Sequence, residues 1–126
     1  MEQQNEWEYL CPSLGFILRI LKAENKKYYN GFVYMPNGTT LTYREAVEVY
    51  KAFICRIFSD NYDTVDIVNY DFTTTYYAIC YLIQVLDSDH SHYKHFRTIA
   101  DDAKRIHFDY AMDLLKSFVR MTFKFE

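Results

Sequence analysis

Beyond Gly38 the chain contains no glycine and no proline, so the last 88 of its 126 residues run without either backbone punctuator. An all-β chain needs a turn every 8–12 residues and commonly places Gly or Pro there. The absence of both therefore predicts that the region after Gly38 is mostly helical. We expect a mainly α fold, a helical bundle of four to five helices, with one short N-terminal β-hairpin at about residues 31–42.

The length of the chain is that of one domain, so we expect residues 1–126 to form a single helical domain. Half of the residues are hydrophobic and 19% are aromatic, which excludes intrinsic disorder. The net charge of −3 is too small to indicate a nucleic-acid-binding protein by charge alone. We find no internal repeat, low-complexity segment or linker in the sequence.

The first predicted helix covers residues 13–29, with Ser13 as its N-cap directly after Pro12. Its apolar residues recur at helical spacing, and they are Leu14, Ile17, Leu18 and Leu21. We expect this helix to fray near Lys26 and to end before Gly31.

The hairpin and the next helix have local sequence signals. Asn37 and Gly38 stand between two short runs of β-forming residues, which is typical of a hairpin. Thr42 and Glu45 match the capping box, in which the two side chains satisfy reciprocal backbone donors, and the helix should end near Ser59. Its predicted apolar stripe consists of Tyr43, Ala46, Val47, Tyr50, Phe53, Ile54, Ile57 and Phe58.

The middle of the chain is acidic, because residues 61–90 contain five Asp and neither Lys nor Arg. Alternating apolar residues favour a short strand within residues 60–71. Residues 72–86 are apolar nearly all round, which predicts a central helix covered by others. The alternative is a strand over residues 72–80, because threonines and tyrosines gather there.

A helical stripe continues from Ser91 almost to the C-terminus. One helix over residues 91–123 would be about 50 Å long, which exceeds a compact domain of this size. Either the helix breaks near His107 to Asp109, or its exposed end packs on a second copy. The second option predicts a homodimer through the C-terminal helix.

Three of the four histidines, His90, His92 and His95, lie within six positions beside Asp87 and Asp89. Imidazole and carboxylate together suit a zinc, nickel or manganese ion. The second, distant pair of ligands that a structural zinc site has is absent from the sequence, and so is a His-Glu-x-x-His motif. A solvated helix N-terminus explains the same residues, so metal binding is the third of our functional hypotheses.

Basic residues after position 90 suggest a second hypothesis, a regulatory protein that binds nucleic acid with a basic C-terminal helix. The residues that would contact nucleic acid are Arg97, Lys104, Arg105 and Arg120. Two aspartates, Asp101 and Asp102, interrupt that side of the helix, and their repulsion of phosphate offsets part of the attraction.

The sequence contains 13 tyrosines, more phenolic hydroxyls than a core of this size can satisfy, so some must lie at the surface. Exposed tyrosines are favoured in protein interfaces. The tyrosines in predicted loops, the hairpin or helix ends are Tyr28, Tyr29, Tyr34, Tyr62, Tyr70 and Tyr93. Our first hypothesis is a non-catalytic protein-binding module, of the kind by which phage or mobile-element proteins inhibit or redirect a host protein.

Cysteine usage indicates the cellular compartment of the protein. Cys11, Cys55 and Cys80 cannot all pair within one chain, and two of them lie in apolar runs, so we expect a reduced, cytoplasmic protein. The charge-free apolar stretch over residues 72–86 is fifteen residues long, which is too short for a membrane span. No nucleophile or phosphate-binding motif is present, so we expect neither an enzyme nor a cofactor.

Overall fold

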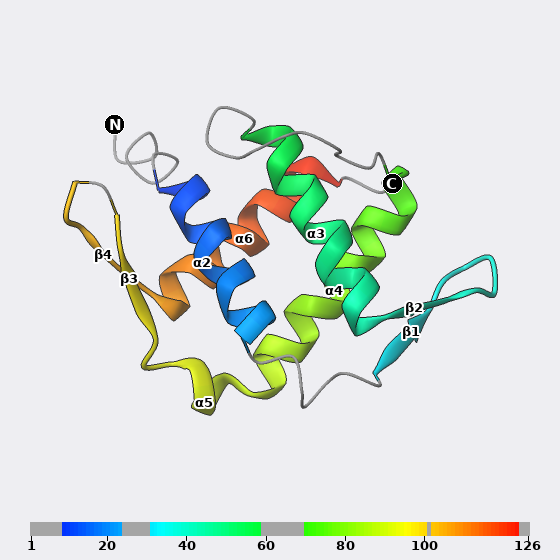
Figure 1. Ribbon diagram of the computed structural model, residues 1–126, viewed down its shortest axis with the longest axis horizontal. Coiled ribbons are helices and arrows are strands. Elements are labelled where there is room, and N and C mark those ends of the chain that lie inside the picture. The colour runs from blue at the N-terminus through cyan, green and yellow to red at the C-terminus, as the bar shows by residue number, and fades with distance from the viewer. Residues whose placement is uncertain (1–8, 24–30, 59–69, 101, 124–126) are drawn as a thin grey trace.

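The computed structural model describes residues 9–23, 31–58, 70–100 and 102–123 (Figure 1). In these residues the fold is mainly helical, with four substantial helices, one helical turn and two short antiparallel hairpins, which confirms the predicted fold class. The elements in chain order are α2 (Leu10–Ala23), β1 (Phe32–Tyr34), β2 (Thr40–Thr42), α3 (Tyr43–Ile57), α4 (Phe72–Ser88), α5 (His90–Tyr93), β3 (Arg97–Ile99), β4 (Arg105–His107) and α6 (Phe108–Thr122).

Helix α2 begins three residues earlier than predicted. The backbone N–H of Ser13 donates to the carbonyl of Tyr9 over 3.0 Å, so Pro12 lies in the first turn, where its missing N–H leaves no bond unmade. Ser13 is therefore a buried residue inside the helix and not its N-cap. The predicted continuation over residues 24–29 lies outside the described residues.

The first hairpin is confirmed, and Gly38 explains its loop. Gly38 has a φ of 88°, its N–H donates to the carbonyl of Met35 over 2.9 Å, and the N–H of Met35 donates to the carbonyl of Thr39 over 2.9 Å. This is a three-residue loop with a residue of left-handed conformation, for which glycine is the natural choice.

The capping box at the start of α3 is also confirmed. The backbone N–H of Glu45 donates to Oγ1 of Thr42 over 3.1 Å, and the N–H of Thr42 donates to Oε1 of Glu45 over 2.9 Å. The helix ends at Ile57, within two residues of the predicted end. The short strand expected within residues 60–71 falls almost wholly on residues 59–69, which lie outside the described part.

Residues 72–80 are helical, so the strand alternative is wrong. Asp71 is the N-cap of α4, and its Oδ1 accepts the backbone N–H of Thr74 over 2.9 Å. Hydrogen bonding with Thr74 is the main cause that holds the pKa of the Asp71 carboxyl below its ordinary value. Burial is less complete than predicted, since tyrosines of α4 are only half-buried and Phe72 is 49% exposed.

The predicted helix over residues 91–123 breaks at His107, as one alternative required, but its first part is not helical. One turn, α5, is followed by a second hairpin. Its loop forms without glycine, because Ala103 takes the left-handed conformation with a φ of 72°. The N–H of Ala103 donates to the carbonyl of Ala100 over 2.9 Å, and the N–H of Ala100 donates to the carbonyl of Lys104 over 2.8 Å.

The second half of the described chain repeats the first at a spacing of 65 residues, as from Tyr43 to Phe108. In each half a helix is followed by a hairpin and a second helix of fifteen residues, and the two hairpins share their register, loop length and backbone hydrogen bonds. This corrects our finding of no internal repeat. The repeat is hidden because only six equivalent residue pairs are identical: Leu21 and Leu86, Tyr28 and Tyr93, Ala46 and Ala111, Lys51 and Lys116, Phe53 and Phe118, and Phe58 and Phe123.

The two halves exchange helices in the core. The first helix of each half packs mainly on the last helix of the other half, α2 on α6 and α4 on α3, as in an intertwined dimer. Figure 1 shows the two hairpins at opposite ends of the molecule. The repeat thus places two surfaces of equivalent backbone far apart, one at each end of a shared core.

The left-handed residue in the second loop yields a direct test. Ala103→Gly is expected to stabilise the protein by about 1 kcal/mol, because L-residues pay about 1–2 kcal/mol for this conformation and glycine returns part of that as chain entropy. Gly38→Ala is the reverse change at the equivalent position, and it should destabilise the protein by a similar amount because its φ is also left-handed. An added Cβ there meets no atom within 4 Å, so we expect no steric clash in addition to this conformational cost. Urea denaturation measures both, and a destabilised Ala103→Gly variant would contradict the expectation.

Candidate binding surfaces

The six predicted interface tyrosines have different outcomes. Tyr34 on β1 is 65% exposed, as expected, whereas Tyr70 is half-buried against the core. Tyr93 is 2% exposed, so its assignment to the surface is wrong. Tyr28, Tyr29 and Tyr62 lie outside the described residues.

Tyr93 is buried because α5 is a single turn that folds back onto the core. Its ring centroid lies 5.6 Å from that of Phe96 and 5.5 Å from that of Phe108. We predicted Tyr93 near the start of a long exposed helix, and the chain reversal after α5 instead turns this side chain inward.

The outer face of the β1–β2 hairpin is aromatic. Phe32 and Tyr34 are two residues apart on β1, so their side chains share one face, and their ring centroids lie 5.3 Å apart in an edge-to-face arrangement. Phe32 is 49% exposed, while the intervening Val33 and the facing Leu41 pack toward the core. Phe32 was missed in the sequence, although the alternation of a strand already places it beside Tyr34.

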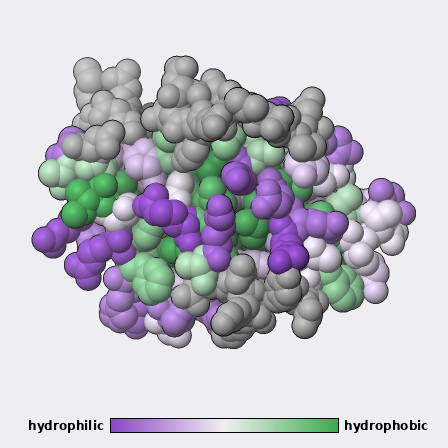
Figure 2. Space-filling model, in the orientation of Figure 1, coloured by the Kyte–Doolittle hydropathy of each residue, from purple (hydrophilic) through white to green (hydrophobic). Residues whose placement is uncertain are grey.

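No residue of this hairpin from Phe32 to Thr42 carries a charge. In Figure 2 the end of the molecule that holds β1 and β2 is mostly pale, that is, of intermediate hydropathy. The opposite end, which holds β3 and β4, shows strongly hydrophilic side chains beside a hydrophobic patch. The two ends therefore differ in chemistry although their backbones are equivalent.

The outer face of the β3–β4 hairpin carries Arg97, Ile99, Arg105 and His107, all exposed. The inward residue of β4, Ile106, is fully buried. The residues that we assigned to a basic helix thus lie on a two-stranded ribbon, because the second hairpin replaces the predicted helix. Arg120 is apart from them, in the last turn of α6, where it donates to Oγ of Ser117 over 3.3 Å.

Polar contacts fasten this second hairpin to α2 and to the residue before it. The hydroxyl of Tyr9 donates to Oδ2 of Asp102 over 2.5 Å, and Nη2 of Arg19 donates to Oγ1 of Thr98 over 2.9 Å. The hydrogen bond from Tyr9 is the main cause that holds the pKa of Asp102 below its ordinary value. Lys104 extends over the Tyr9 ring, with Nζ 5.5 Å from the ring centroid.

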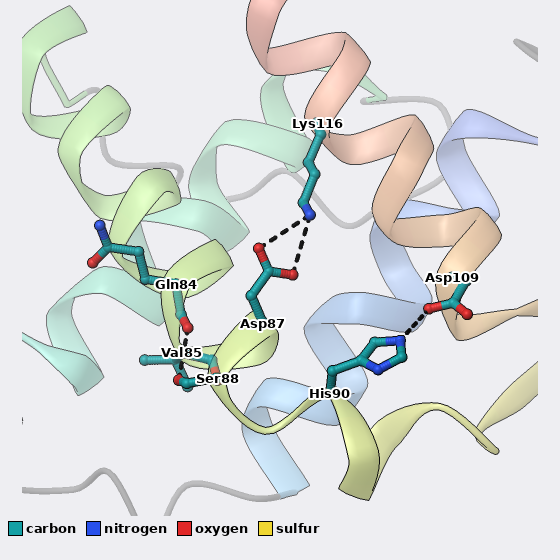
Figure 3. Close-up of polar contacts among 7 residues, drawn as sticks. All are labelled: Gln84, Val85, Asp87, Ser88, His90, Asp109 and Lys116. Carbon is teal, nitrogen blue, oxygen red and sulfur yellow. Dashed lines mark hydrogen bonds and ion pairs between the residues drawn. The ribbon is translucent and has the colours of Figure 1, made fainter.

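The three histidines of the metal hypothesis do not form a ligand group. In Figure 3, His90 points to Asp109, and its Nε2 lies 2.6 Å from Oδ1 of that residue. Asp87 points instead to Lys116, with which it forms an ion pair. His92 packs on the rings of two aromatic neighbours. In the part of the chain that the structure describes, no three His, Cys, Asp or Glu side chains are grouped so that they could hold a metal ion.

The polar residues drawn beside these pairs have a local structural role. Ser88 Oγ lies 2.8 Å from the carbonyl of Gln84 and 3.1 Å from that of Val85, so its hydroxyl satisfies carbonyls of the last turn of α4 (Figure 3). Serine hydroxyls commonly bond to the carbonyl of the preceding helical turn in this way.

Two of the cysteines, Cys55 and Cys80, are buried or half-buried in helices. Burial raises the pKa of the Cys80 thiol, with a smaller opposing effect from a hydrogen bond to Tyr76, so the reactive thiolate is disfavoured. Cys55 is buried in α3. A pocket of about 380 Å³ lies between the end of α2 and the start of α3, and among its described lining residues Glu48 is the one carboxylate, beside Lys22 and Arg44.

The homodimer through the C-terminal helix was predicted because a helix over residues 91–123 would be too long for one compact domain, and this helix is shorter than predicted. Helix α6 has fifteen residues, about 22 Å, and most of its apolar residues are buried against the rest of the chain, although Met121 is 59% exposed. Dimerisation stays a prediction without support from the length of this helix.

Comparison with protein-family models, with curated proteins and with solved structures finds no match for this chain. Among the described helices, none is both long and apolar enough to cross a membrane.

Proposed function

We propose that this protein is a non-catalytic binding module that contacts a partner protein through the outer face of the β1–β2 hairpin. The observation that carries the proposal is the pair of exposed rings of Phe32 and Tyr34 on a ribbon without charged residues. Aromatic residues are enriched in protein interfaces and charged ones are depleted at interface centres.

The repeat supports the same conclusion by an internal comparison. The positions equivalent to Phe32 and Tyr34 on the second hairpin are Arg97 and Ile99, on the same backbone. The hairpin fold therefore does not require aromatic rings on its outer face. Burial of the two rings against a partner would remove apolar surface from water, which is favourable. A binding role therefore accounts for two exposed rings that the fold does not need.

The partner surface that fits this face is an uncharged groove or pocket into which two rigid rings insert. A ring contributes a large contact area at a low cost in side-chain entropy, which is why aromatic residues dominate the energy of many interfaces. Inhibition or redirection of a host protein by a phage or mobile-element protein is the biological setting that we propose for such a module.

The test is Phe32→Ala combined with Tyr34→Ala. Loss of two interface rings is expected to weaken partner binding by at least about 30-fold, which corresponds to about 2 kcal/mol for a centre of binding energy. The partner is first captured from a nuclease-treated lysate, then purified, and its affinity for both chains is measured by calorimetry.

Phe72→Ala is a matched control, because Phe72 is also 49% exposed but lies at the start of α4. Binding should be retained in this variant, and all chains should show the melting behaviour of a folded protein. A double variant that binds the partner as tightly as the original chain would refute the proposal.

A further inference from the structure

The second hairpin carries positive charges that the fold does not use. Arg97 and Arg105 are exposed, and neither forms an ion pair with another residue in the ranges that the structure describes. Their equivalents in the first hairpin are Phe32 and Thr40, which are uncharged. Because the same backbone forms without them, the two arginines are not required for folding.

The strand register gathers these side chains on one face. Arg105 pairs with Ile99 and Arg97 pairs with His107, and all four side chains point to the outer side of the ribbon. The two arginines are diagonal neighbours on adjacent strands, positions whose Cα atoms lie about 7–8 Å apart in an antiparallel ribbon. Ile99, 66% exposed, lies directly across from Arg105, so an apolar side chain accompanies the two cations.

The described carboxylates near this face are engaged by donors of the protein. Asp102 accepts the hydroxyl of Tyr9 and the backbone N–H of Lys104, the latter over 3.0 Å, and Asp109 lies against His90. Asp102 is thereby held toward Tyr9 at the start of α2. The guanidinium groups of the ribbon thus stay available to an external anion.

We propose that the outer face of the β3–β4 hairpin is a binding site for double-stranded DNA, separate from the protein-binding face at the other end. The major groove of B-form DNA admits a two-stranded β-ribbon, and arginine binds both phosphate oxygens and the edge of guanine. An exposed aliphatic side chain between the arginines suits the thymine methyl group in the same groove.

The shape of the ribbon selects the kind of nucleic acid. In A-form RNA duplexes the major groove is deep and narrow, and side chains cannot read it. A ribbon that projects from the end of the molecule, as β3 and β4 do in Figure 1, therefore fits B-form DNA and not an RNA duplex. Because the two hairpins lie at opposite ends, DNA and a protein partner can be bound at the same time.

The experiment measures the fluorescence anisotropy of a labelled DNA duplex of about two helical turns, titrated with the full chain at several salt concentrations. In Arg97→Ala combined with Arg105→Ala, affinity at low salt should fall by about tenfold, and the slope of log affinity against log salt should decrease in magnitude by about two. Both residues are exposed, so the melting temperature should not change.

The control is Lys51→Ala combined with Arg56→Ala, which removes the same charge from two exposed positions of α3. Unchanged binding in the control supports a defined site. The proposal is overturned if the chain does not bind the duplex, if both double variants weaken binding equally, or if an RNA duplex binds as tightly as DNA. Phe32→Ala with Tyr34→Ala should leave DNA binding intact, which separates this proposal from the protein-binding one.

Discussion

Phe108→Ala is expected to lower the free energy of unfolding by about 3–5 kcal/mol, the range for removing a large aromatic side chain from a core. Phe108 is fully buried at the first position of α6, and its ring packs on Tyr93. Its backbone N–H also donates to the carbonyl of Phe96 over 3.0 Å, at the base of the second hairpin. The substitution therefore leaves a cavity where helix, hairpin and α5 meet, and chemical denaturation measures the loss.

Phe108→Tyr is the control for this prediction. The equivalent residue in the first half is Tyr43, whose buried hydroxyl donates to the carbonyl of Leu21 over 2.7 Å. Leu86 is the equivalent of Leu21 in the second half, so we expect its carbonyl to accept the new hydroxyl and Phe108→Tyr to cost less than Phe108→Ala. If Phe108→Ala lowers the free energy of unfolding no more than Phe108→Tyr does, the ring does not contribute to the core as we expect.

The second large effect is expected at Leu21 and Leu86, an identical pair at equivalent positions. Both are almost completely buried, so Leu21→Ala and Leu86→Ala should each cost about 2–5 kcal/mol. Each half packs its first helix mainly on the last helix of the other half, so the two halves depend on each other for the burial of these helices. Each substitution should therefore weaken both halves together, in one cooperative transition.

Hydrogen exchange followed along the chain tests this cooperativity. In either variant, amides of α3 and α6 should lose protection in parallel, whereas Lys51→Ala, an exposed control on α3, should change stability by less than about 0.5 kcal/mol. Exchange that increases in one half only, or two separate unfolding transitions, would contradict the intertwined arrangement.

Elements with local signals could be predicted from the sequence. The capping box of Thr42 and Glu45, and the Asn37-Gly38 loop, are both confirmed, because each depends on residues within a few positions of one another. The second hairpin could not be predicted in this way. Its loop uses Ala103 in the left-handed conformation that normally indicates glycine, at an energetic cost to the alanine.

The candidate sites show the same division. Exposure of Tyr34 followed from its place in a predicted hairpin, and the neighbouring Phe32 could have been found from strand alternation. The burial of Tyr93, and the position of Arg97 and Arg105 on one ribbon, depend on a chain reversal that no local pattern indicated. For this reason the helix predicted to hold Arg97 and Arg105 does not form in that region, whereas Arg120 does lie on a helix.

By itself the sequence determined the class of the fold and the local structure of its first half. Helical spacing, capping residues and the scarcity of Gly and Pro act over a few residues, and their effect does not depend on distant parts of the chain. Only the tertiary structure decided that the chain is a repeat with exchanged helices. Packing in a core depends on apolar character more than on the identity of each residue, so the two halves share one backbone while their outer faces are aromatic at one end and cationic at the other.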